Sequence, residues 1–130
     1  MDKSKIVEEF NIYCIQFLDF VYDITKNSDI TFYKKAIKVI FNGDKSKIIE
    51  QFIAYCLKFK DKIDSKDKDY FINTDFSSEC NNDSLLHVIK IKDIFSKIDD
   101  ATSDLIFQYL IVLSELAANY LKQFNLIETK

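Results

Sequence analysis

Few side chains in this sequence have the type and spacing that enzyme chemistry needs. The only histidine, His87, has Ser84 and Asp83 nearby, but no second histidine and no nucleophile elbow accompany it. We therefore interpret His87 as a surface or cap-region residue. Phosphate loops and dinucleotide fingerprints need several glycines, and Gly43 is the only one here. The sequence thus predicts a protein that is not an enzyme and has no cofactor.

An acidic segment around Asp67, Asp69, Asn73 and Asp75 has the residue types of a calcium loop. An EF-hand needs Gly at its sixth position and Glu at its twelfth, and counting from Asp67 those positions hold other residues. We interpret the segment as a solvated run of charges, with no metal site.

The three cysteines, Cys14, Cys56 and Cys80, are odd in number, far apart and without metal-ligand spacing. Their neighbours predict that Cys14 and Cys56 are core residues, whereas Cys80 lies in a polar loop, where a reactive thiol is the alternative. The first ten residues hold two Lys and three acids and resemble no secretory signal. We therefore expect free thiols in an intracellular, not secreted, protein.

Charge is distributed unevenly along the chain. Residues 26–62 hold nine Lys and four acids, although the formal net charge of the whole chain is −3. Five of these lysines, which we call the lysine corner, bracket one helix–turn–helix: Lys34, Lys35, Lys38, Lys45 and Lys47. One interpretation is a cationic patch for nucleic acid or an acidic partner. The alternative is two ordinary helices with solvated Lys faces that are offset by acids elsewhere in the fold.

The chain contains no Arg, the side chain that pairs bidentately with phosphate and guanine. Any binding of nucleic acid through the lysine corner is therefore expected to be independent of sequence and strongly dependent on salt.

Aromatic residues are the second clue to an interaction surface, since 12 Phe and 7 Tyr exceed the usual need of a core this size. Those at or beyond the edges of the apolar stripes are Tyr13, Tyr22, Tyr33, Tyr55 and Phe107. Tyr33, Tyr55 and Phe107 join the lysine corner as the candidate surface for a protein partner or a second copy. The alternative is that Tyr side chains rim the core with their hydroxyls in water.

The elements that position these residues are helices. One Gly, no Pro and apolar residues at spacings of three and four predict a single all-α domain over residues 1–130. Five helices are expected, with the last one central, at residues 4–25, 30–41, 45–63, 84–98 and 101–124. The apolar run over residues 109–113 is far shorter than the ~20 residues that span a bilayer, so no transmembrane segment is expected.

Two details of the helix pattern can be checked directly. Gly43, between the second and third helices, is expected to be the left-handed residue that ends a helix. The apolar stripe of the second helix consists of Tyr33, Ile37, Ile40 and Phe41, widened by Ala36.

Four segments together resemble small uncharacterised helical proteins of giant DNA viruses, of the mimivirus and phycodnavirus type. They are Phe17-Leu18-Asp19-Phe20 and residues 49–60, 65–73 and 107–120. Phe107 stands where the family pattern has Trp. The resemblance implies a virus-encoded helical protein without an agreed activity. The abundance of Phe, Tyr, Ile, Asn and Lys, which have AT-rich codons, is also typical of an AT-rich genome.

The function hypothesis is a non-enzymatic helical protein that binds a host or viral protein inside the infected cell or in the virion, with a homodimer as one form. A second hypothesis is sequence-nonspecific binding of nucleic acid or of an acidic partner through the lysine corner. A third is a helical mimic of a host regulator, for which the sequence offers no motif.

Overall fold

The computed structural model describes residues 2–74 and 90–128, and only the backbone of the final helix from residue 124 on. The described residues form seven α-helices and one short 3-10 helix, and they contain no strand. The all-α prediction is therefore confirmed. The elements are α1 (Lys3–Thr25), α2 (Ser28–Gly43), α3 (Lys47–Tyr55), η1 (Leu57–Phe59), α4 (Lys60–Asp64), α5 (Lys68–Asn73), α8 (Ile91–Lys97) and α9 (Asp100–Glu128).

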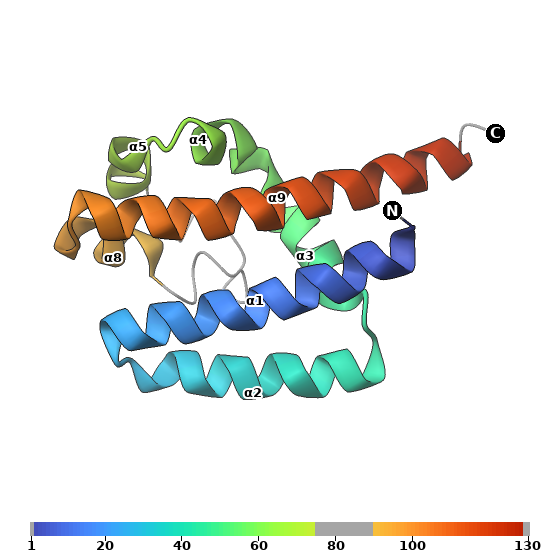
Figure 1. Ribbon diagram of the computed structural model, residues 1–130, viewed down its shortest axis with the longest axis horizontal. Coiled ribbons are helices and arrows are strands. Elements are labelled where there is room, and N and C mark those ends of the chain that lie inside the picture. Colours follow the sequence, from blue (N-terminus) through green and yellow to red (C-terminus); the bar gives the residue numbers. More distant parts are fainter. Residues whose placement is uncertain (1, 75–89, 129–130) are drawn as a thin grey trace.

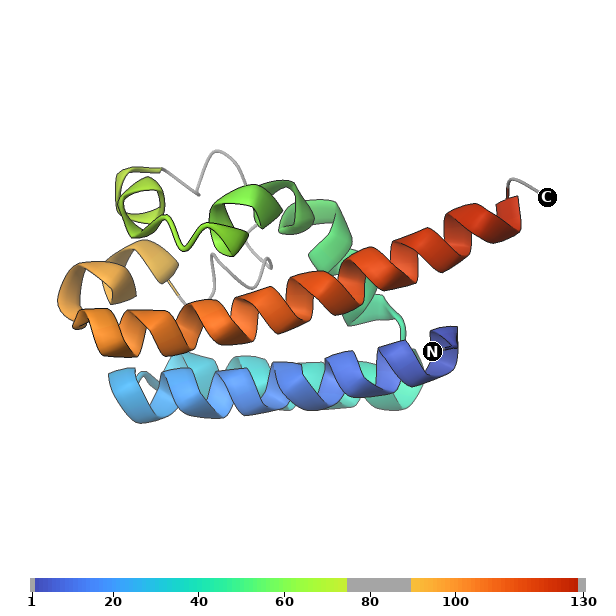
Figure 2. The ribbon, with the colours of Figure 1, turned by 45° about the horizontal axis from the view of Figure 1, so that its top comes forward.

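The three longest helices set the shape of the bundle. Figure 1 shows α1 and α9 side by side and antiparallel, with α2 on the far side of α1 from α9. The short helices α3 and α4 pack against α9, and α5 packs on α8 (Figure 2). Because α9 contacts α1, α3, η1 and α4, the prediction that the last helix is central is confirmed.

Short polar side chains begin several of the helices, as N-cap residues do. The carboxylate of Asp2 accepts a hydrogen bond from the Lys5 N–H at 2.8 Å. The side chain of Asn27 accepts one from the Asp29 N–H at 3.0 Å, in the break between α1 and α2. Asp and Asn residues thus begin these helices in a chain with one Gly and no Pro.

The acidic segment contains another such cap. The carboxylate of Asp67 accepts a hydrogen bond from the Tyr70 N–H at 3.1 Å and begins α5, and Asp69 lies in the first turn of the same helix. Asp75 lies outside the described residues. Asp67 and Asp69, predicted from the sequence to lie in a solvated run of charges, thus belong to the start of α5.

The expectation for Gly43 is wrong. Gly43 is the last residue of α2 and its φ is not positive. The helix ends because Asp44 is extended, and the Asp44 N–H donates to the Ile40 carbonyl at 2.7 Å. Left-handed residues follow two other helices: Lys26, with φ 53°, directly after α1, and Lys66, with φ 54°, shortly after α4. A Cβ atom on Gly43 meets nothing within 4 Å, so neither conformation nor space requires glycine there.

The predicted helix over 45–63 is also corrected, because it is three elements rather than one. The chain leaves α3 at Cys56, tightens into η1 and continues as α4. The break lets α3 contact α1, α2 and α9 while α4 follows α9, and both Phe59 and Ile63 stay buried.

The boundaries of the last two predicted helices differ less from those in the structure. The predicted helix over 84–98 is described only from Ile91, after the left-handed Lys90, and residues 84–89 lie outside the described residues. The last helix begins at Asp100 and extends to Glu128, four residues further than predicted.

Aromatic side chains fill the end of the core between α5, α8 and α9. Phe95 and Phe107 stack with ring centroids 4.8 Å apart, and Phe71 lies 5.8 Å from each of them. Phe59 contacts Phe71 at 6.4 Å. Phe107 is 2% exposed, so its predicted place on the interaction surface is wrong. Part of the aromatic excess of the sequence is thus used to pack these short helices on α9.

One helix of the described part, α9 from Asp100 to Gln123, is long and apolar enough by length and composition to cross a membrane. A core helix of a helical bundle passes the same test, and α9 packs against α1, α3 and α4. The absence of a transmembrane segment stays a prediction.

Candidate interaction surfaces

One lysine of the lysine corner is paired within the fold. The Lys34 ammonium pairs with the Asp19 carboxylate of α1, so this lysine joins α2 to α1. Lys35 and Lys38 on α2, Lys45 in the turn and Lys47 at the start of α3 are exposed and pair with no carboxylate of the described residues. The structure therefore leaves four of the five lysines available to a partner.

Acids from the rest of the chain offset several of the other lysines. The Lys60 ammonium bonds the Asp64 carboxylate at 2.6 Å and the Glu115 carboxylate of α9 at 2.8 Å, and these hydrogen bonds raise the pKa of Lys60. Lys66 pairs with Asp104, also on α9. Exposed pairs of this kind contribute little stability. Of these two lysines only Lys60 belongs to the positive region of residues 26–62, so these pairs offset a small part of its charge.

The candidate aromatic residues are mostly part of the core rather than of a surface. Tyr33 and Tyr55 are half-buried and pack against the core, as does Tyr22. Tyr13 is 36% exposed and lines a shallow groove of about 240 Å³ with Leu105, Tyr109 and Val112 of α9. The alternative interpretation, tyrosines at the rim of the core, describes Tyr33 and Tyr55 better than an interaction surface does.

Among the described side chains, the most exposed large apolar ones lie elsewhere, on α2. Phe32 is 69% exposed and Val39 is 71% exposed, and Ala36 between them is exposed too. Residues four and three apart lie on one side of a helix, so these three form one continuous strip, which we call the outer face of α2. The sequence prediction missed Phe32 and Val39 and assigned Ala36 to the buried stripe. Their spacing of i, i+4 and i+7 is the signal that identifies them.

The packing of α2 explains why this face is uncovered. Ile30 and Ile37, both 1% exposed, lie on the opposite side of the helix and are buried in the core. α2 contacts α1 and α3, and Figure 1 shows it at the edge of the bundle. The helix thus has apolar side chains on two sides, of which the fold buries one.

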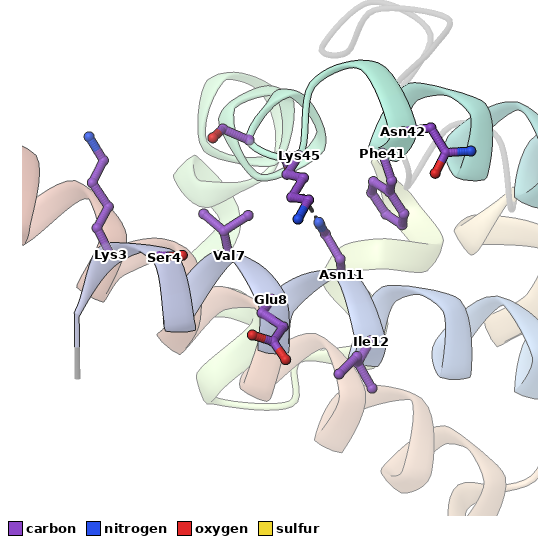
Figure 3. Close-up of a pocket in the computed structure, with 10 residues that line it drawn as sticks. Lys3, Ser4, Val7, Glu8, Asn11, Ile12, Phe41, Asn42 and Lys45 are labelled. Atoms are coloured by element: carbon purple, nitrogen blue, oxygen red, sulfur yellow. Dashed lines mark hydrogen bonds between the residues drawn. The ribbon is translucent and has the colours of Figure 1, made fainter.

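A groove of about 690 Å³ lies beside the lysine corner, between the first half of α1 and the end of α2 (Figure 3). Apolar Val7 and Phe41 line it together with charged Lys3, Glu8 and Lys45. The side-chain amide of Asn11 donates to the Lys45 carbonyl at 3.0 Å and so ties α1 to the turn after α2. The groove has charges of both signs and no group of residues that favours one ligand.

Two of the three cysteines are buried as predicted, since Cys14 and Cys56 are each 1% exposed and form no disulfide. Burial, and to a lesser degree the nearby Cys56, raises the pKa of the Cys14 thiol to about 12. Cys80, His87, Ser84 and Asp83 lie outside the described residues.

We predict that Cys14 resists alkylation by iodoacetamide at pH 8 in the folded protein, because the thiolate is the reacting form and is nearly absent there. Mass spectrometry of the Cys14 peptide measures the labelling, with urea-unfolded protein as the control. Equal labelling of Cys14 in the folded and unfolded protein would contradict this account of the core.

Within residues 2–74 and 90–128, no group of three or more His, Cys, Asp or Glu side chains is placed to hold a metal ion. What the described side chains do offer is the outer face of α2, with exposed Lys35 and Lys38 on one side of it. Comparison of the chain with family models, with curated proteins and with solved structures finds no match.

Proposed function

We propose that this protein is a non-enzymatic interaction protein that binds another protein through the outer face of α2. The observation that carries the proposal is the exposure of Phe32 and Val39, each more than two-thirds open to solvent on the same side of one helix. Single exposed apolar residues are ordinary, but a continuous strip that the fold leaves uncovered is typical of a binding surface. As the giant-virus resemblance implies, we take the partner to be a host or viral protein inside the infected cell.

The energetic argument supports this choice of surface. Complete burial of a Phe or Val side chain contributes about 1.5–3 kcal/mol, so covering the exposed parts of Phe32 and Val39 is worth about 1–2 kcal/mol each. Large apolar residues that become buried at an interface are the ones whose truncation weakens binding most.

Affinity purification of the tagged protein from the cells that naturally make it tests the proposal. The variant Phe32→Ser with Val39→Ser is expected to retain on the order of a hundredth of the partner that the original protein retains. The variant Leu105→Ser is the matched control, because Leu105 is 45% exposed on α9, outside the proposed surface. Equal recovery of the same partner by the double variant, or its loss only in Leu105→Ser, rejects the proposal.

A second candidate function rests on the four exposed lysines without a carboxylate partner among the described residues. They suit binding of nucleic acid through phosphate contacts, which depend on salt and not on sequence. If they act in this way, replacing Lys35, Lys38, Lys45 and Lys47 with Gln lowers the salt concentration that elutes the protein from a double-stranded DNA column. Passage of the original protein through the column without retention at low salt rejects this candidate.

A further inference from the structure

The outer face of α2 has two different flanks. Lys35 is exposed and lies three and four residues from Phe32 and Val39, so it borders the strip on one side. Lys38, also exposed and three residues after Lys35, lies beyond it on the same side. The other edge carries Asp29 in the first turn of the helix and then the half-buried, uncharged Tyr33 and Ile40. Positive charge thus lies on one side of the apolar strip, at Lys35 and, further round the helix, at Lys38.

The strip has a shape that suits another helix. Ala36 is a small residue between the larger Phe32 and Val39, so its position leaves a hollow between two ridges. Helices pack by inserting side chains of one into such hollows of the other. A partner helix seated there lies next to Lys35 and Lys38, whose ammonium groups lose water as the interface forms. Carboxylates on that edge of the partner compensate for this loss, whereas uncharged or basic side chains leave the ammonium groups unpaired.

We propose that the outer face of α2 binds an amphipathic helix of another protein that has Asp or Glu along the edge facing Lys35 and Lys38. The inference rests on the proposed function, since it names the chemistry of the partner for the same surface. Apolar residues of the partner helix cover Phe32 and Val39, and the charge pairs fix its orientation and help it to associate.

The charge arrangement favours this occupant over a second copy of the chain. Lys35 is close to the middle of the strip, which runs from residue 32 to residue 39. A two-fold antiparallel pair of α2 helices therefore sets Lys35 of one copy against Lys35 of the other, and like charges at that distance repel. A membrane surface fits less well too, because helices that lie on anionic bilayers carry a broad, strongly basic polar face, whereas here the basic residues follow one edge.

A displayed library of amphipathic helices tests the inference. Each member has about five turns and a fixed apolar stripe, with Glu, Gln or Lys at random on both flanks. Members are selected for binding to the original protein and counter-selected against Phe32→Ser with Val39→Ser. We expect the surviving helices to carry Glu rather than Lys on one flank by about fivefold, and Lys35→Glu with Lys38→Glu to reverse that preference.

The outcomes separate the inference from the proposed function. If the surviving helices have random or Lys-rich flanks, the inference that the partner is acidic is wrong, but binding through the outer face of α2 is still supported. Absence of any helix whose binding depends on Phe32 and Val39 overturns both. Two further outcomes are that the original protein sediments with phosphatidylserine vesicles or dimerises in the ultracentrifuge. If Phe32→Ser with Val39→Ser abolishes that behaviour, a membrane or a second copy occupies the outer face of α2 and the inference is overturned.

Discussion

Replacing Phe107 with Ala is expected to lower the free energy of unfolding by about 3–5 kcal/mol. Phe107 is buried, stacks on Phe95 at 4.8 Å and contacts Phe71 at 5.8 Å. These residues come from α9, α8 and α5, so one truncation leaves a cavity where three helices meet. Urea unfolding, followed by circular dichroism, measures the change.

The matched control is Phe32→Ala, which removes the same side chain from an exposed position on α2. Its stability is expected to stay within about 0.5 kcal/mol of the original. If Phe107→Ala costs no more than Phe32→Ala, Phe107 is not a core residue and the description of the aromatic cluster is wrong.

The second large effect contrasts the two sides of α2. Ile37→Ala is expected to destabilise the fold by about 2–5 kcal/mol, because Ile37 is 1% exposed. Val39→Ala, two positions away but 71% exposed, is expected to change stability by less than about 0.5 kcal/mol. The same urea experiment applies to both variants.

This contrast bears on function as well as on folding. A residue that the fold does not need, and that is apolar and exposed, is available for binding. Comparable destabilisation by both variants would mean that the outer face of α2 is covered within the chain itself. The interaction surface proposed here would then not exist.

The sequence predicted the long helices well because their apolar spacing is regular over many turns. α1 and α9 match their predicted ranges to within four residues at each end. The break at Cys56 could not be predicted, because the apolar residues over 45–63 keep the spacing of one straight helix. The break is seen only in the tertiary structure, where α3 contacts α1, α2 and α9, and α4 contacts α9.

The candidate site was predicted less well, for a related reason. α2 has apolar residues on two sides, and the pattern alone does not say which side the neighbouring helices cover. Ile37, Ile40 and Phe41 are covered as predicted, whereas Ala36 is exposed. Tyr33 was predicted both for the apolar stripe and for the surface, and Phe32 and Val39 were not predicted for either. Phe107 was misplaced because α9 meets other helices on several sides, so a residue beyond one stripe packs against α5 and α8.

The lysine corner shows the limit of charge patterns. The run of lysines in the sequence is real, yet Lys34 pairs with Asp19, which lies 15 positions earlier in the chain. Pairing across helices depends on how α1 and α2 lie together, which spacing within one helix does not report. The four remaining lysines are the part of the prediction that can still act in binding.

Site-specific photocrosslinking tests the central claim most directly. A photoreactive amino acid replaces Val39 in one version of the protein and Leu105 in another, and both are expressed in the cells that naturally make the protein. The proposed surface predicts a discrete crosslinked protein from position 39 and none from position 105. Crosslinks from position 105 alone, or the same crosslinks from both positions, would contradict binding through the outer face of α2.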